Sequence, residues 1–488
     1  MPPHRPSPSP TARAAAAGRV VGDLVGGMVS SFHPKRLPPM LRATYARELV
    51  SWMFLPLMLG TIEGGTIAIV VKKSFTGVGG IDEGTLNLAV TILTAAPNFA
   101  NLSSFVWAAL SKGRAKVPFI SALQVATAVL VFLIAFAPSS PSGLWMVTAL
   151  AVVARTCWTG VITLRTAVWR NNYPSANRAA IAGKMAIVQA LMLALAGWIV
   201  GESMDWDARS FHVVYPLLAV MGIVGNSIYR KVRLRGQRRL ARAELAGRAG
   251  PGFTLSPISL AGAFVRSMRD VVTTLAEDPL YRRFMWWMFV FGFGNLMLSA
   301  PLALVLNDEF DVSYHEGILI NTVIPLLVMP LSIPLWAKLM GRTHIIEFRA
   351  LHAWTFVAAS IGIWLASATH TLWLFYAAAA ILGVAFGGGM LAWNLGHQDF
   401  APAHKDGQYM AVHVTLNGIR GLLAPVASYA LYEWLKDSNR VSIVFLICVV
   451  VNTIGAFGFV LMRRRLQRDR IAAAETAAGN EVDSPSTI

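Results

Sequence analysis

Three ionisable residues lie deep inside long apolar stretches of the sequence, and they are Glu63, Arg155 and Arg420. A charge at the centre of a membrane-spanning helix costs about 2.5–3.5 kcal/mol on insertion scales, so each should face a partner or water. A buried carboxyl group holds its proton more tightly than an exposed one. We therefore expect Glu63 to bind a coupling proton or a cationic group. The alternative is that Glu63 forms a static ion pair with Arg155, or lies near the outer surface and is solvated.

Arg155 also begins a seam of polar residues. Arg155, Thr159, Thr163, Thr166 and Arg170 are spaced four, four, three and four apart, which places them on one helical face. A guanidinium group offers a planar pair of donors to a carboxylate or phosphate. We predict that Arg155 and Thr159 contact substrate and that Arg170 belongs to a gate. Alternatively, the threonines hydrogen-bond their own backbone carbonyls.

A second polar seam contains His413, Asn417 and Arg420, spaced four and three apart. We predict that Asn417 and Arg420 contact substrate and that His413, which titrates near neutral pH, takes part in proton coupling. The alternative for His413 is a satisfied polar group without function. Asn98 and Asn295 are further predicted substrate contacts, with hydrogen bonding between helices as their alternative role.

The elements that must position these residues follow from composition. The chain has 488 residues, 55% hydrophobic and 14% charged, with a mean hydropathy of +0.55, whereas soluble domains carry about 25% charged residues. Its apolar residues lie in blocks of the length that crosses a bilayer, about 20 residues. We predict an all-α integral membrane protein with about twelve spans. They cover residues 49–71, 84–110, 117–137, 143–168, 180–201, 211–230, 283–306, 314–339, 345–368, 371–395, 408–434 and 441–462.

An internal repeat divides these spans into two sets of six. Landmarks of the first half return in the same order in the second, which predicts two pseudo-symmetric six-helix bundles at residues 45–231 and 281–463. The paired landmarks are Trp52-Met53-Phe54 with Trp287-Met288-Phe289, Glu83-Gly84 with Glu316-Gly317, and Gly113-Arg114 with Gly341-Arg342.

The charges outside the spans predict an orientation. Basic residues gather in the tails and in alternate turns, and acidic residues gather in the opposite turns. By the positive-inside rule, both termini face the cytoplasm of a cell whose inner membrane holds the chain. Residues 1–44 are expected to form a disordered basic tail, residues 232–280 a basic linker with an amphipathic helix, and residues 464–488 a cytoplasmic tail. The net charge of +17 is assigned to contacts with anionic lipid and not to nucleic acid.

The arrangement of six spans, a long basic loop and six more spans, with Gly-Arg turns after spans two and eight, resembles the major facilitator superfamily over residues 45–465. The family's signature in the first turn is G-x-x-x-D-R-x-G-R-[RK]. Here the Gly113-Arg114 core is present, but Leu110 stands in place of the acid, and Lys338 stands where the second half would carry one. The resemblance implies a gate at these turns, which contain Lys112, Gly113, Arg114, Gly341 and Arg342. It also implies a central cavity between spans one, four, seven and ten.

Enzymatic activity is not expected. The sequence contains no phosphate-binding loop with GK[ST], no zinc-type His/Cys cluster and no nucleophile elbow. Direct ATP drive, a cofactor and a metal are therefore not expected either. The two cysteines, Cys157 and Cys448, fall in apolar stretches and are expected to be buried and unbridged.

Taken together, these features predict a secondary transporter, a monomer in the lipid bilayer that moves a small organic anion together with protons by alternating access. One alternative is proton-driven export of amphipathic compounds, suggested by the aromatic residues Trp286 and Trp287. Another is a membrane receptor or scaffold that does not transport, suggested by the missing acid at Leu110.

Overall fold

The computed structural model describes residues 30–246, 257–402, 405–438 and 440–482, and the regular elements in these ranges are helices. The first half contains α2 (Pro39–Gly60), α3 (Gly64–Phe75), α4 (Glu83–Phe99), α5 (Ser104–Leu110), α6 (Lys116–Ile134), α7 (Pro141–Asn172), α8 (Ser175–Trp206) and α9 (Phe211–Tyr229). The linker contains α10 (Gln237–Ala246) and α11 (Pro257–Glu277). The second half contains α12 (Pro279–Met297), α13 (Ser299–Asp308), α14 (Tyr314–Ile318), η4 (Leu319–Val323), α15 (Ile324–Met340), α16 (Ile345–Ala368), α17 (Leu372–Leu395), η5 (Gly396–Asp399), α18 (Asp406–Leu435) and α19 (Ser442–Val482).

Eleven helical segments of the described residues are long and apolar enough to cross a membrane. The predicted eleventh span corresponds to α18, which is 30 residues long but does not meet the same apolarity. His413, Asn417 and Arg420 lower its hydropathy. Many large apolar side chains lie exposed on the outside of the bundle, for example Trp286 at 62% and Trp373 at 67%. A surface of this kind is suited to lipid and not to water.

The two halves repeat one packing pattern, which confirms the predicted pseudo-symmetry. Helix α2 packs on α8 and α9, as α12 packs on α18 and α19, and α6 packs on α7 and α9, as α16 packs on α17 and α19. Glycines make the close contacts at corresponding places, since a small residue lets two helices approach closely. The matching contacts are Gly222 with Met58 and Gly225 with Leu55 in the first half, and Gly455 with Phe291 and Gly458 with Trp287 in the second.

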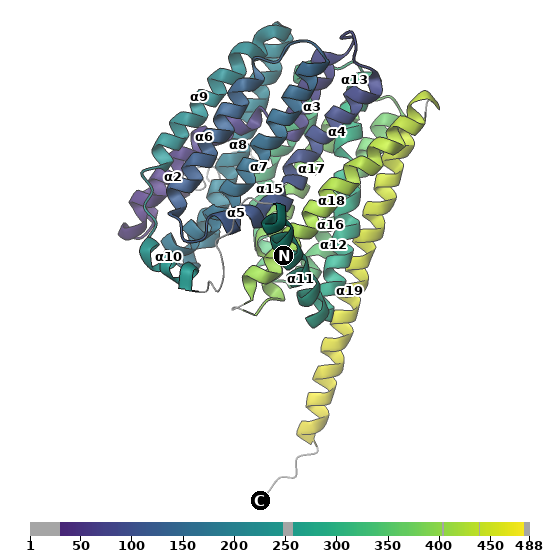
Figure 1. The fold of residues 1–488 in the computed structure, drawn as a ribbon. Helices are drawn as coiled ribbons and strands as arrows, with labels where there is room; N and C mark the ends of the chain where they lie inside the picture. The colour runs from purple at the N-terminus through teal and green to yellow at the C-terminus, as the bar shows by residue number, and fades with distance from the viewer. Residues whose placement is uncertain (1–29, 247–256, 403–404, 439, 483–488) are drawn as a thin grey trace, which may run out of the picture.

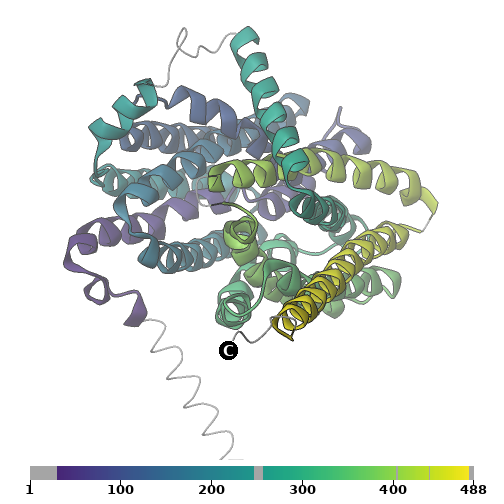
Figure 2. The same ribbon diagram turned by 90° about the horizontal axis from the view of Figure 1, so that it is seen from below.

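The bundle has two chemically different ends. The basic end carries the turn at residues 111–116 and the linker helix α10, and both the start of α2 and the end of α19 lie there (Figure 1). The acidic end carries Glu83, Asp308 and Asp311. Seen from the basic end, the first half, purple to teal, and the second half, green to yellow, lie side by side (Figure 2). They meet where α4 packs on α18 and where α8 packs on α14 and α15.

Several boundaries differ from the sequence analysis. Helix α2 begins at Pro39, within the segment assigned to the disordered tail, because Leu41 is fully buried against the bundle. Residues 1–29 of that predicted tail lie outside the described residues. The first predicted span is broken between Gly60 and Gly64, and α19 remains helical to Val482.

Candidate functional site

The break between α2 and α3 holds the first predicted site residue. Helix α2 ends at Gly60, and Glu63 precedes α3 in an extended backbone conformation. A helix end inside the bundle leaves backbone carbonyls without intrahelical partners. The Ile62 carbonyl accepts hydrogen bonds from Arg155 Nε at 2.9 Å and Nη2 at 2.8 Å. Arg155 therefore supplies the hydrogen bonds that this carbonyl lacks at the helix break.

Glu63 and Arg155 form an ion pair. Arg155 Nη2 lies 2.6 Å from Glu63 Oε2, with the side chains 9% and 27% exposed, respectively. The pairing considered as the alternative in the sequence analysis is thus present. Arg155 Nη1 makes no hydrogen bond to any residue in the part of the chain that the structure describes. Two oppositely charged groups therefore meet at the break between α2 and α3.

The threonines below Arg155 on α7 use their hydroxyls within their own helix. Thr159, Thr163 and Thr166 donate to carbonyls three or four residues earlier, at 2.7–3.2 Å. Exposure increases along the seam towards the basic end: Arg155 and Thr159 are buried, Thr163 is half-buried, and Thr166 and Arg170 are exposed. The seam is polar in composition, but its hydroxyls are already bonded to the backbone.

The second half carries its own buried cation. Arg420 is 6% exposed, donates to Asn417 Oδ1 through Nε and Nη2 at 3.2 and 2.8 Å, and donates to the Met288 carbonyl at 2.6 Å. Its guanidinium fills the space beside Gly292, where an added Cβ would lie 2.3 Å from Nη1. The structure thus brings Arg420 and Asn417 together, as predicted, but with neutral partners.

Two cationic or titratable residues near Arg420 escaped the sequence analysis as site candidates. Arg349 on α16 is 4% exposed, its Nη1 lies 3.2 Å from His352 Nδ1, and its charge interacts with that of Arg420. His352 Nε2 lies 2.8 Å from the Ala385 carbonyl. The spacing of three residues between Arg349 and His352 would have revealed one helical face.

Of the remaining predicted residues, His413 lies within range of the charges of Arg420 and Arg349, whereas Asn295 and Asn98 make other contacts. His413 is 2% exposed, with its ring edge-on to Trp393 at 4.5 Å, and its Nε2 has no partner among the described residues. Asn295 donates to the Phe291 carbonyl at 3.1 Å, within its own helix. Asn98 lies where α4 meets α18, against Gly421. For Asn98 and Asn295, a substrate contact remains a prediction.

A cluster within the first half was also missed. Glu48 is fully buried, and its Oε2 accepts a hydrogen bond from Trp169 Nε1 at 2.8 Å. The guanidinium of Arg165 lies 4.2 Å from the ring centre of Trp52 and 4.4 Å from that of Trp169. This geometry gives a cation–π contact on two rings. Glu48 was overlooked because it stands at the edge of an apolar block.

At the acidic end, a buried lysine joins the two halves. Lys72 on α3 is 1% exposed, and its Nζ lies 2.9 Å from Asp308 Oδ1 at the end of α13. Lys72 also donates to Asn87 Oδ1 at 2.6 Å, and Tyr432 donates to Asp308 Oδ2 at 2.6 Å. A buried, hydrogen-bonded ion pair is screened by salt far less than an exposed one.

The same network continues to α18. Asn87 donates to Glu433 Oε1 at 2.7 Å, and Lys436 lies 2.8 Å from Glu433 and 3.5 Å from Glu83. The hydrogen bond to Glu433 raises the pKa of Lys436, which keeps this ammonium charged. The contacts from Asn87 to Glu433 and from Glu83 to Lys436 both cross between the halves.

A third inter-half contact at this end uses a helix terminus. The Asp205 carboxylate at the end of α8 accepts hydrogen bonds from the backbone of Tyr314 at 2.7 Å and of His315 at 3.0 Å, at the start of α14. Amides at a helix N-terminus favour an anionic partner. Lys73 adds a bond to the Val312 carbonyl at 2.8 Å. The acidic end is therefore closed by polar contacts between the halves.

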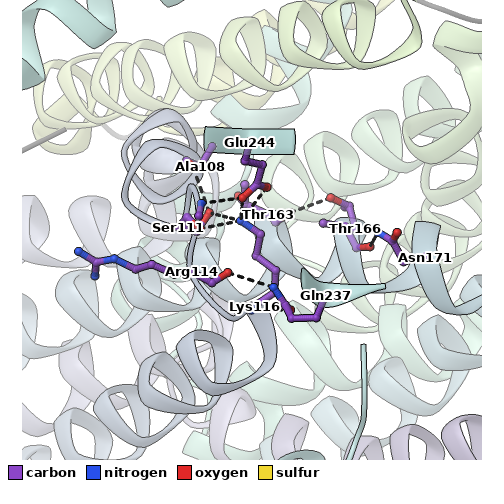
Figure 3. A network of polar contacts seen from close by, with 11 residues as sticks. Ala108, Ser111, Arg114, Lys116, Thr163, Thr166, Asn171, Gln237 and Glu244 are labelled. Carbon is purple, nitrogen blue, oxygen red and sulfur yellow. Dashed lines mark hydrogen bonds and ion pairs between the residues drawn. The ribbon is translucent and has the colours of Figure 1, made fainter. Parts of the chain in front are cut away.

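The predicted gate residues lie at the basic end. Lys112, Arg114 and Arg170 are exposed, and so are Gly341 and Arg342. Gly113 has φ +72°, a left-handed conformation that suits glycine. In contrast, Gly341 has φ −70°. The first turn is held by residues of the linker helix α10, seen close by in Figure 3. The two turns are therefore related in position but not in backbone conformation.

Comparisons with known proteins agree with this architecture. The sequence profile of the Major Facilitator Superfamily matches residues 48–425. A mutant of the nucleoside transporter NupG is 12% identical, with a TM-score of 0.59 over 85% of this chain and 99% of that one. A mutant of the peptide transporter POT in complex with sulfate is 17% identical, with a TM-score of 0.60 over 86% of this chain and 95% of that one.

A POT family transporter in complex with 5-aminolevulinic acid is 16% identical, with a TM-score of 0.61 over 85% of this chain and 96% of that one. No curated protein sequence matches the chain. At these identities, the solved structures establish the fold alone, whereas the family profile covers most of the chain. The chain belongs to the Major Facilitator Superfamily of multi-pass membrane transporters.

Proposed function

We propose that this protein moves a small organic anion across the membrane together with a proton, by alternating access. The observation that carries the proposal is the Glu63–Arg155 pair, 2.6 Å apart, at the break between α2 and α3. Alternating access in transporters of this kind works by rocking two bundles about a site near the midplane. Charged groups inside such a bundle are by default functional.

The pair suggests how a proton and an anion would be linked. Protonation of Glu63 removes the negative charge that balances Arg155. The buried guanidinium then requires another anion, because an unpaired buried charge is unfavourable. Arg155 Nη1, which bonds to no described residue, and the released Nη2 form a fork that fits a carboxylate or phosphate. Loss of the proton would restore the Glu63 pair and expel the solute.

The second half supports an anionic solute. Arg420 is hydrogen-bonded to neutral groups, the Asn417 amide and the Met288 carbonyl, and Arg349 lies within range of its charge. Neither guanidinium bonds to a carboxylate among the described residues, so these two buried cations create a positive potential inside the bundle. One similar structure holds sulfate, so this fold accommodates a small anion in at least that protein.

The contacts at the two ends of the bundle favour a conformation that is closed at the acidic end and open at the basic end. Polar contacts between the halves close the acidic end, among them Lys72–Asp308 and Asp205 with the start of α14. Along α7, the polar seam becomes more exposed towards the basic end. By the positive-inside rule, the basic end faces the cytoplasm. We take this conformation as the one open to the cytoplasm, with both termini on that side.

The two tryptophans that suggested export of amphipathic compounds, Trp286 and Trp287, are poorly placed for that role. Trp286 is 62% exposed on the outside of the bundle, and Trp287 packs against Gly458 of α19. Neither ring is then free to line a central cavity. Anion transport therefore remains the better-supported candidate.

The experiment measures how much of each radiolabelled solute in a panel enters proteoliposomes from the outside under an imposed pH gradient. The panel contains carboxylates, phosphate and sulfate, with a nucleoside and a lipophilic cation for comparison. We expect uptake of at least one anion, its loss in Arg155→Met, and its retention in Arg209→Met, which removes an exposed arginine. Uptake of only neutral or cationic solutes, or uptake unaffected by Arg155→Met, would overturn the proposal.

A further inference from the structure

We propose that Glu244 of the linker helix α10 is a positioning residue for the transport cycle, because it supplies the carboxylate that the turn at residues 111–116 lacks. The inference rests on the proposed transport function. Leu110 occupies the position at which the family signature has an acid. The structure places another carboxylate at this turn, brought there from more than 120 residues away in sequence.

The contacts of Glu244 are direct. Its Oε2 accepts a hydrogen bond from the Gly113 amide at 2.7 Å and one from Lys116 Nζ at 2.9 Å, and its Oε1 lies 2.8 Å from the same Nζ (Figure 3). Lys116 also donates to the Ser111 carbonyl at 2.6 Å. The Lys116 side chain is only 3% exposed and that of Glu244 is 23% exposed, so solvent screens the pair weakly.

Other residues of the linker complete the attachment. Gln237 accepts from the Lys116 amide at 3.1 Å and donates to the Arg114 carbonyl at 3.3 Å. Leu245 covers Gly113, where an added Cβ would lie 2.8 Å from its Cδ2. Helix α10 therefore bonds to Gly113, Arg114 and Lys116 of the turn, and these bonds attach it to the first half.

In the second half, an acid of the bundle itself bonds at the corresponding turn. There, Asp399 accepts a hydrogen bond from the Ile345 amide at 2.6 Å, at the start of α16. Asp399 precedes Phe400 in sequence, and its counterpart before Tyr173 is the neutral Asn172. Asn172 accepts a hydrogen bond from the Arg235 amide of the linker at 3.0 Å. In the first half, residues of the linker therefore make the contacts near this turn that an acid of the bundle makes in the second half.

A mechanical consequence follows. The turn at residues 111–116 connects α5 with α6, and α5 also contacts α11, the second linker helix. Holding the turn in one backbone conformation, with Gly113 at φ +72°, keeps the basic ends of α5 and α6 in fixed relation. Without the carboxylate, Lys116 would be a buried cation, and the turn would sample other conformations.

The test compares the full-length protein with Glu244→Gln in lipid nanodiscs by hydrogen–deuterium exchange, and in proteoliposomes by transport. We expect amide exchange of residues 111–116 and 237–246 to rise about tenfold to a hundredfold, because the variant loses one charge-assisted contact. We expect kcat to fall with KM unchanged, because Glu244 lies outside the solute pathway. Glu277→Gln is the matched control, since Glu277 of the same linker forms an exposed pair with Lys405 at 2.8 Å.

A double-mutant cycle with Lys116→Met makes the test specific to the contact. If Glu244 acts through Lys116, the double variant exchanges no faster than the faster single variant. Unchanged exchange in Glu244→Gln, or an effect equal to that of Glu277→Gln, would overturn the inference. So would increased exchange with unchanged kcat, or a KM that rises while kcat stays constant. If Glu244→Gln raises exchange but the wild-type protein moves no solute, the contact of Glu244 is upheld and the proposed function is refuted.

Discussion

The ion pair between Lys72 and Asp308 offers the sharpest perturbation of the closed acidic end. Lys72→Met keeps the length of the side chain but removes the ammonium group. Because the pair joins α3 of the first half to α13 of the second, its loss should destabilise the conformation in which these halves touch. The opposite conformation, open at the acidic end, should then become more populated.

The magnitude follows from the geometry. Removing one partner from a fully buried ion pair costs about 3–5 kcal/mol. The Lys72 side chain is 2% exposed, but that of Asp308 is 20% exposed and keeps its bond from Tyr432. We therefore expect the smaller cost of a charge-assisted hydrogen bond, about 2–3 kcal/mol. At 1.4 kcal/mol per tenfold change, the ratio of the two conformations shifts by a factor of about 30 to 150.

Double electron–electron resonance measures this shift directly. Spin labels at Ser139 and Ala368, both exposed at the acidic end, report the separation of the two halves in a background of Cys157→Ala and Cys448→Ala. In Lys72→Met, we expect a new population at longer distance. A distance distribution that matches the unsubstituted background, or one equally altered by removing the exposed Arg440, would refute the reasoning.

Two further predictions concern stability, measured as the thermal unfolding temperature in detergent. Gly458→Ala places a Cβ 2.0 Å from the Trp287 ring and should lower the unfolding temperature, at a cost of about 1–3 kcal/mol by overpacking. Gly183→Ala, inside α8 with no atom within 4 Å of its Cβ, should leave the unfolding temperature unchanged or raise it, because alanine favours a helix over glycine; equal unfolding temperatures for the two variants would contradict the close packing. Glu48→Gln removes the charge of a fully buried carboxylate that accepts a hydrogen bond from Trp169 at 2.8 Å and influences the charge of Arg165, and should cost about 1–3 kcal/mol; adding Arg165→Met should recover part of that loss, and purely additive losses would show that the two residues are independent.

The sequence predicted the fold because hydropathy blocks and repeated landmarks are local signals. The return of Trp52 and Gly113 in the second half marks helices that pack in matching ways, as Gly225 and Gly458 demonstrate. The number of spans was nearly recovered for the same reason. Helix α18 is the exception. It was predicted as a span like the others, but the polar seam around Arg420 makes it less apolar than they are.

The pairing of the site residues was only partly predictable. Spacing placed Asn417 and Arg420 on one face, and they do bond to one another. The Glu63–Arg155 pair could be stated only as an alternative, because it joins the break before α3 to α7 across 92 positions. A sequence pattern gives the face of a helix but not the helix opposite.

Contacts between the halves were the least accessible to sequence reasoning. Lys72 stands at the end of the bundle where acidic residues gather, and its partner Asp308 lies in the other half. Glu244 is a parallel case in the linker: it is the single acid of the basic helix α10, and it bonds to a turn far away in the chain. In both cases a residue that departs from its local charge pattern marks a long-range contact.

The central claim is that protonation of Glu63 exchanges its carboxylate for the solute as the partner of Arg155. The most direct measurement is the movement of protons themselves, followed by a pH-sensitive dye inside proteoliposomes when a transported anion is added outside without an imposed pH gradient. The wild-type protein should acidify the lumen in step with solute uptake, because anion and proton enter together, and Glu63→Gln should move solute without moving protons. Equal proton movement in both proteins, or solute flux in the wild type with no proton movement, would contradict the account.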